Sequence, residues 1–126
     1  MSLEQRANRI DLLLSHVWMV RTFIKHSDES SEVEELTEIY RDLYDYSLAL
    51  GVPLKDRDWD QYMKIAAKKL KRLKGATDLF CQLQPEISEH TNFVMAATSL
   101  RLATDEIIRL VQGPSAESDG GGNSDE

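Results

Sequence analysis

The sequence predicts an all-α protein: an up-down-up-down four-helix bundle over residues 1–112, followed by a disordered acidic tail over residues 113–126. Apolar residues recur at spacings of three and four along most of the chain, whereas no useful stretch shows the period-two alternation of a strand. Four such segments, joined by short connections, are typical of an antiparallel bundle. With 126 residues, of which 41% are hydrophobic, the chain can bury one core without disulfides or metal.

The first helix is expected from about Leu3 to Lys25 and is too apolar to lie on a surface. Ser2 and Gln5 have the spacing of a capping box, in which each side chain accepts a free backbone N–H of the first turn. The polar side chains fall in one narrow arc, and the apolar ones cover roughly twice the ~100° stripe of a surface helix. We therefore expect this helix to contact neighbours on several sides.

The second helix is expected to begin near Ser31, where Glu34 completes another capping box. Its apolar residues share one face and its acids fill the opposite one. Gly51 suits the left-handed position that ends many helices, and Pro53 prevents the helix from continuing.

The third helix is expected from Asp58 to about Leu83, because its apolar residues keep alternating steps of three and four straight through Gly75. A break at Gly75, which would give two shorter helices, is the alternative. Pro85 fits the first turn of a fourth helix, which ends at Gly113.

The formal charge is −7, from 15 basic and 22 acidic residues, and residues 113–126 carry four acids and no base. The Gly, Ser and Asp content of this tail predicts disorder. An acidic chain repels phosphate backbones, so no nucleic-acid partner is expected. The apolar run Leu12–Val20 is too short to span a bilayer, which argues against a membrane partner. The lone Cys81 cannot form an internal disulfide and favours a reducing, cytoplasmic location.

The sequence carries no pattern that specifies a catalytic or metal site. It has neither the Glu-x-x-His pairs of di-iron bundles nor a His-Glu-x-x-His motif, and no cofactor is expected. Cys81 has no cationic neighbour in the local sequence and is expected to behave as a small hydrophobe. These observations favour a non-enzymatic protein.

Two polar residues of the first helix, Arg21 and His16, project into its apolar sector. A buried guanidinium without a partner is very unfavourable, so Arg21 should find a carboxylate, backbone carbonyls or a water-filled cleft. One interpretation is an interior ion pair or a side chain that reaches solvent. The other is a polar pocket in which Arg21, His16 and His90 bind an anionic small ligand.

Arg21 and His26 also form an Arg-x4-His motif, which resembles the signature of HEPN-domain ribonucleases, a family of small helical bundles. The resemblance implies that Arg21 and His26 would act on the scissile phosphate and the ribose hydroxyl of RNA. It covers six residues and the fold class.

The leading hypothesis for function is a helical module that binds a protein partner or a second copy of itself. It depends on the lack of catalytic patterns and on segregated charge, with acids on the outer face of the second helix and bases at Lys64–Lys74 of the third. One interpretation is that each charged face is simply solvated. If the two faces meet, they meet between molecules, because each lies opposite its own apolar stripe. The alternative is a ligand-binding or hydrolytic bundle with a polar cleft around Arg21, His16 and His26.

Overall fold

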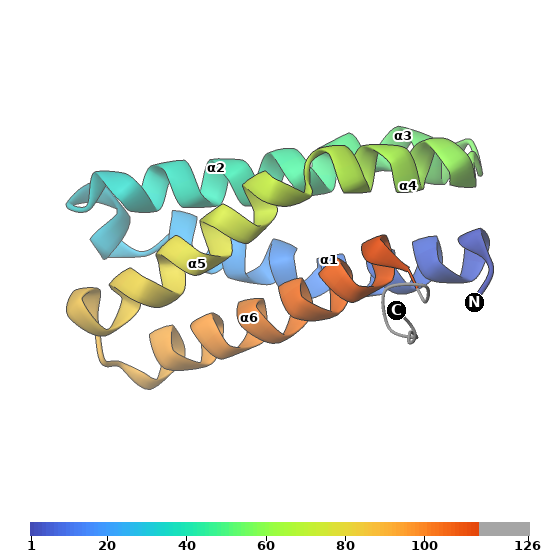
Figure 1. Cartoon of the computed structure of the whole chain (residues 1–126). Coiled ribbons are helices and arrows are strands. Elements are labelled where there is room, and N and C mark those ends of the chain that lie inside the picture. The colour runs from blue at the N-terminus through green and yellow to red at the C-terminus, as the bar shows by residue number, and fades with distance from the viewer. Residues whose placement is uncertain (114–126) are drawn as a thin grey trace.

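The structure is a computed structural model that describes residues 1–113, and these residues are all-helical, as the apolar periodicity predicts (Figure 1). The elements in chain order are α1 (Leu3–Lys25), the 3₁₀ helix η1 (Asp28–Ser31), α2 (Glu34–Ala49), α3 (Gly51–Lys55), α4 (Trp59–Lys68), α5 (Leu70–Ile87) and α6 (Thr91–Gln112). The predicted disorder of residues 114–126 lies outside the described residues. No helix within residues 1–113 is long and apolar enough to cross a bilayer.

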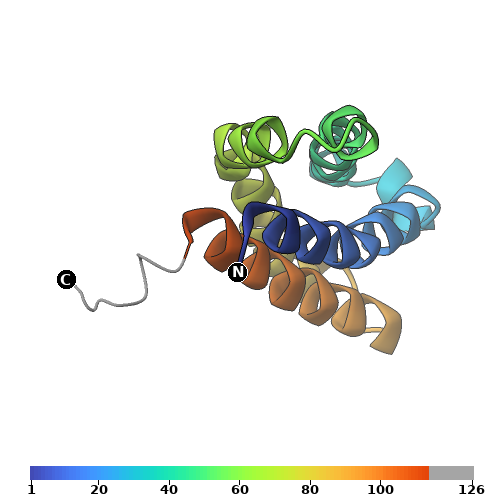
Figure 2. The same cartoon turned by 90° about the vertical axis from the view of Figure 1, so that its right-hand side faces the viewer.

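The long helices surround one hydrophobic core. α1 packs against α2 and α6, and α5 packs against the same two helices from the other side. Figures 1 and 2 both show α6 alongside α1, and the two helices run in opposite directions. The core side chains that are fully buried include Ile10, Val17, Leu36, Leu43, Leu73, Phe80, Leu100 and Ile107.

α1 has the predicted bounds and the predicted capping box. The Ser2 hydroxyl accepts the N–H of Gln5 at 3.1 Å, and the Gln5 side chain accepts the N–H of Ser2 at 2.9 Å. The helix contacts α2, α4 and α6, which agrees with its broad apolar surface. Two large apolar side chains of α1 are nevertheless more than half exposed, since Leu12 and Met19 are each 65% exposed.

The predicted start of the second helix is wrong, whereas its predicted end is right in position, since α2 ends at Ala49 with Leu50 as C-cap, although Gly51 is not left-handed. Ser31 ends η1, and its hydroxyl donates to the Asp28 carbonyl at 2.7 Å, so a local turn occupies the group that would cap α2. α2 begins at Glu34 without a side-chain cap. At the other end, the short helix α3 begins at Gly51 and includes Pro53, whose missing N–H is tolerated in a first turn.

The third predicted helix breaks at Lys69 and not at Gly75. The Tyr46 hydroxyl, from α2, donates to the carbonyl of Ala66 at 3.0 Å. In an unbroken helix that carbonyl would accept the N–H of Leu70. The chain therefore bends between α4 and α5 where a side chain of another helix binds the backbone, while Gly75 lies inside α5.

The predicted start of the fourth helix is also wrong. Pro85 lies in the last turn of α5, and α6 begins at Thr91 after the N-cap His90. Gly113 ends α6 as predicted, but it is buried and belongs to the folded part rather than to the tail. Its φ of 84° suits glycine, and a Cβ there would lie 3.2 Å from the Arg6 guanidinium.

Arg6 of α1 caps the C-terminal end of α6. Its Nε donates to the Leu110 carbonyl at 2.8 Å, and its Nη2 donates to the Val111 carbonyl at 3.1 Å. These carbonyls belong to the last turn, whose acceptors have no partner within the helix. A positive charge also interacts favourably with this end of the helix dipole.

Candidate protein-interaction surface

Arg21 lies against two aromatic rings that also contact each other, rather than beside a carboxylate. Its guanidinium carbon is 4.6 Å from the ring centroid of Trp18 and 4.7 Å from that of Tyr44 on α2. Nη1 donates to the Thr22 hydroxyl at 3.4 Å, whereas the buried Nε has no hydrogen-bond partner. Of the partners expected for Arg21, neither a carboxylate nor a backbone carbonyl is present within residues 1–113, and the half-buried side chain makes cation–π contacts instead.

His16 lies on a different side of α1 from Arg21. Its Nδ1 is 3.0 Å from the Ser99 hydroxyl of α6, and its ring is exposed. Arg21 contacts α2 and His16 contacts α6, so the structure does not bring the two residues together.

His26 and His90 line a common hollow of about 390 Å³ at one end of the bundle, between the end of α1 and the start of α6. The His26 Nδ1 is 3.0 Å from the Thr22 carbonyl, which can only accept, so this nitrogen carries the proton of the neutral ring. The His90 Nδ1 accepts the N–H of Asn92 at 3.0 Å and caps α6. Asp28 also lines the hollow. The structure thus places the four predicted site residues in three separate surroundings.

A groove of about 550 Å³ runs between α1 and α6. Its lining comprises Arg9, Leu13, His16, Met95, Thr98, Ser99, Leu102, Ala103, Glu106 and Arg109. At one end, Glu106 pairs with Arg109 and lies 3.8 Å from the Nε of Arg9. Two arginines therefore share one carboxylate, and this end of the groove carries a local excess of positive charge.

Four large apolar side chains of α1 and α6 are more than half exposed, and we call them the apolar quartet: Leu12, Met19, Met95 and Leu102. Their side chains are 65%, 65%, 55% and 66% exposed, in that order. Met95 and Leu102 line the groove. The two members on α1 are seven residues apart, and so are the two on α6. A seven-residue spacing keeps side chains on one stripe of a helix, as in the seam of a coiled coil.

The sequence alone does not identify the quartet, because the broad apolar surface of the first helix predicts neighbours on several sides and does not show which side stays uncovered. The seven-residue spacing on both helices was the available signal. It could be read as a surface only once the position of α6 beside α1 was known.

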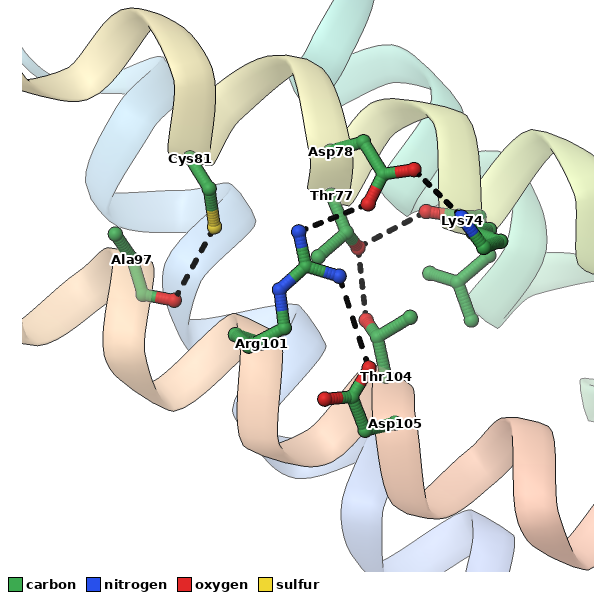
Figure 3. Close-up of polar contacts among 9 residues, drawn as sticks. Lys74, Thr77, Asp78, Cys81, Ala97, Arg101, Thr104 and Asp105 are labelled. Carbon is green, nitrogen blue, oxygen red and sulfur yellow. Dashed lines mark hydrogen bonds and ion pairs between the residues drawn. The ribbon is translucent and has the colours of Figure 1, made fainter.

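The opposite side of α6 differs, since polar contacts hold it to α5 (Figure 3). Asp78 accepts from Lys74 and from Arg101, each at 2.8 Å, and these two hydrogen bonds lower the pKa of Asp78. Arg101 also lies 3.6 Å from Asp105. Beneath these exposed pairs, the buried hydroxyls of Thr77 and Thr104 are 2.8 Å apart. This side of α6 is occupied within the molecule.

Cys81 belongs to the same α5–α6 contact. Its sulfur lies 3.7 Å from the Ala97 carbonyl, and burial raises the pKa of the thiol, which opposes its activation as a nucleophile (Figure 3). Among the described residues, no group of three or more His, Cys, Asp or Glu side chains is placed to hold a metal ion.

The charged faces of α2 and α5 are not as separate as predicted. The two helices pack together, and Asp45 and Arg72 line a common hollow of about 230 Å³. Opposite charges therefore approach each other at this edge within one molecule. No ion pair joins the two faces within residues 1–113, so a contact between the faces of two molecules stays a prediction.

The chain was compared with protein-family models, curated proteins and solved structures, and nothing matches in any of the three comparisons. No function is therefore transferred from another protein.

Proposed function

We propose that the protein is a non-enzymatic cytoplasmic module with a four-helix-bundle architecture, and that it binds a protein through the face formed by α1 and α6. The apolar quartet is the observation that carries this proposal. Its four members are each more than half exposed on two neighbouring helices, and two of them, Met95 and Leu102, line the groove between these helices. Exposed apolar groups that gather on one face mark interaction surfaces more often than scattered ones do.

The quartet also limits the strength of binding. Full burial of a Leu or Met side chain contributes about 1.5–3 kcal/mol, so side chains already one-third buried would gain about 1–2 kcal/mol each. The whole quartet then supplies about 4–8 kcal/mol on this face. Association itself opposes binding by about 4–15 kcal/mol, so the partner must bury apolar surface of its own. We expect a weak, reversible complex.

The alternative of a hydrolytic or anion-binding site receives less support. The Arg21 guanidinium is engaged by Trp18 and Tyr44. The hollow that contains His26 also contains the carboxylates of Asp28 and Glu29, which repel phosphate and other anions. Protein binding is therefore the function that we favour over RNA cleavage.

Photo-crosslinking tests the proposal. A photoreactive amino acid is introduced at Leu12 or Leu102 of the quartet, and as a control at Leu48 or Val52, which are 60% and 68% exposed on α2 and α3. We expect covalent protein adducts from the quartet positions and none, or far fewer, from the controls. Equal adduct yields at all four positions would overturn the proposal, because binding would then not depend on the α1–α6 face.

A further inference from the structure

We infer that the protein bound at the α1–α6 face is a second copy of this chain, related to the first by a two-fold axis that makes the paired faces antiparallel. The inference rests on the proposed function and names its partner. It depends on two observations, which are the symmetry of the apolar quartet and the charges at the two ends of the face.

The apolar quartet is symmetric about the contact between His16 and Ser99. On each helix, one member lies four residues before this contact and the other lies three residues after it. Because α1 and α6 run in opposite directions, the two leucines lie on one side of the contact and the two methionines on the other.

A two-fold axis through this contact sets the leucines of one copy against the methionines of the other. Every such contact is made twice, as in any isologous interface. Small polar residues between the members of the quartet, Ser15 on α1 and Thr98 on α6, allow the paired helices to approach.

The ends of the face are placed at matching distances from the same contact. Arg109 lies ten residues beyond Ser99, which is about 15 Å along α6. His26 lies ten residues beyond His16, which is about 15 Å along α1 in the opposite direction. The two-fold axis therefore places the arginine end of each copy over the histidine end of the other.

These two ends carry opposite charge. The arginine end has Arg9 and Arg109 with the single carboxylate of Glu106. The lining of the hollow at the histidine end includes Asp28 and Glu29 and no lysine or arginine. In the antiparallel arrangement both ends are complementary, whereas a parallel arrangement would set like charges together. A different protein would have to present two matching apolar stripes and two charged ends of opposite sign. A second copy of this chain already presents such a surface.

Charge reversal tests the inference on the full chain. In Arg109→Glu both ends of the face become acidic, and in Asp28→Lys the acidic end loses its negative charge. We expect each variant alone to dimerise about tenfold more weakly than wild type at low salt, as measured by sedimentation equilibrium. A mixture of the two variants should recover part of the association, because one end then keeps its native pairing of opposite charge and the other sets an acidic end against a neutral one instead of a second acidic one.

Lys64→Glu is the matched control for Arg109→Glu, since Lys64 is exposed on α4 and the charge change is the same. It should leave the dimer unchanged. Leu102→Glu should abolish the dimer while circular dichroism still reports a helical protein. A dimer that survives Leu102→Glu, or a mixture of charge variants that shows no recovery, would overturn the inference.

The crosslinking experiment distinguishes this inference from the proposed function. Adducts with twice the mass of the chain, together with a dimer in sedimentation, would support both. If the adducts contain a different protein and the wild-type chain stays monomeric at every concentration, the inference that the partner is a second copy is overturned. The proposed function, binding of a protein at this face, would still stand. A monomeric chain without quartet-dependent adducts would overturn both.

Discussion

Tyr46 and Tyr62 are both buried, yet replacing each by Phe should have opposite consequences. Tyr46 is 2% exposed and its hydroxyl donates to the Ala66 carbonyl at 3.0 Å, where α4 gives way to α5. Tyr62 is fully buried, and its hydroxyl has no hydrogen-bond partner among the described residues. One substitution therefore removes a hydrogen bond, and the other removes only an unsatisfied polar group.

The expected magnitudes follow from this difference. Tyr46→Phe leaves the Ala66 carbonyl without its partner, and a buried unsatisfied acceptor destabilises by about 1–3 kcal/mol. Tyr62→Phe keeps the ring and removes a desolvated hydroxyl, so its effect should lie between zero and a gain of about 1–2 kcal/mol. The two variants are closely matched, because each loses one oxygen atom from a buried phenol.

Urea unfolding followed by circular dichroism measures both changes. The free energy of unfolding should fall for Tyr46→Phe and stay level or rise for Tyr62→Phe, with similar denaturant slopes. Burial also raises the pKa of both phenols above the ordinary value of about 10, so unfolding releases protons at alkaline pH. Wild-type stability should therefore decline as pH rises past about 10, and each substitution should lessen that decline.

A loss of stability in Tyr62→Phe equal to that in Tyr46→Phe would refute the reasoning. It would mean that the Tyr62 hydroxyl has a partner in solution.

Four further perturbations test other contacts. Burial raises the pKa of Asp11, so Asp11→Asn should increase the free energy of unfolding at neutral pH. This gain in stability should shrink in acid, where the wild-type carboxyl is protonated, and urea titrations at a series of pH values measure it. Thr77→Val and Thr104→Val should each cost about 1–3 kcal/mol, and a double-mutant cycle should give a coupling of at least about 0.5 kcal/mol. Arg6→Met should cost about 1–2 kcal/mol and speed hydrogen exchange in the last turn of α6. Arg21→Met should lose only about 1–2 kcal/mol in urea unfolding, because no buried acid is left unpaired, and Arg21→Lys should recover that loss only in part.

Local sequence was sufficient for features that depend on one segment. The bounds and the capping box of α1 follow from Ser2, Gln5 and the apolar spacing that comes after them. The bend at Lys69 could not be predicted, because it depends on the Tyr46 hydroxyl, which comes from another helix. No pattern around Lys69 indicates that contact.

In the candidate site too, the features that depend on one helix could be predicted, whereas those that depend on contacts between helices could not. The helical periodicity of the first helix predicts that Arg21 and His16 need partners. The partners themselves lie on other helices: Tyr44 of α2 contacts Arg21, and Ser99 of α6 contacts His16. Which side of a helix is covered depends on where its neighbours pack, so the exposed quartet could not be separated from core residues beforehand. His26 and His90 come together because the end of α1 lies beside the start of α6.

The hydrogen bonds of Arg6 join positions that are 104 and 105 residues apart in the chain. During synthesis, the core face of α1 emerges early but cannot be covered by α6 until nearly all of the helical region has left the ribosome. Folding of this chain should therefore finish after translation of α6, and α1 should need protection from aggregation until then. The hydrogen bonds of Arg6 also hold the N-terminal end of α1 close to the C-terminal end of α6. A circular permutant that joins these two ends should therefore retain the fold.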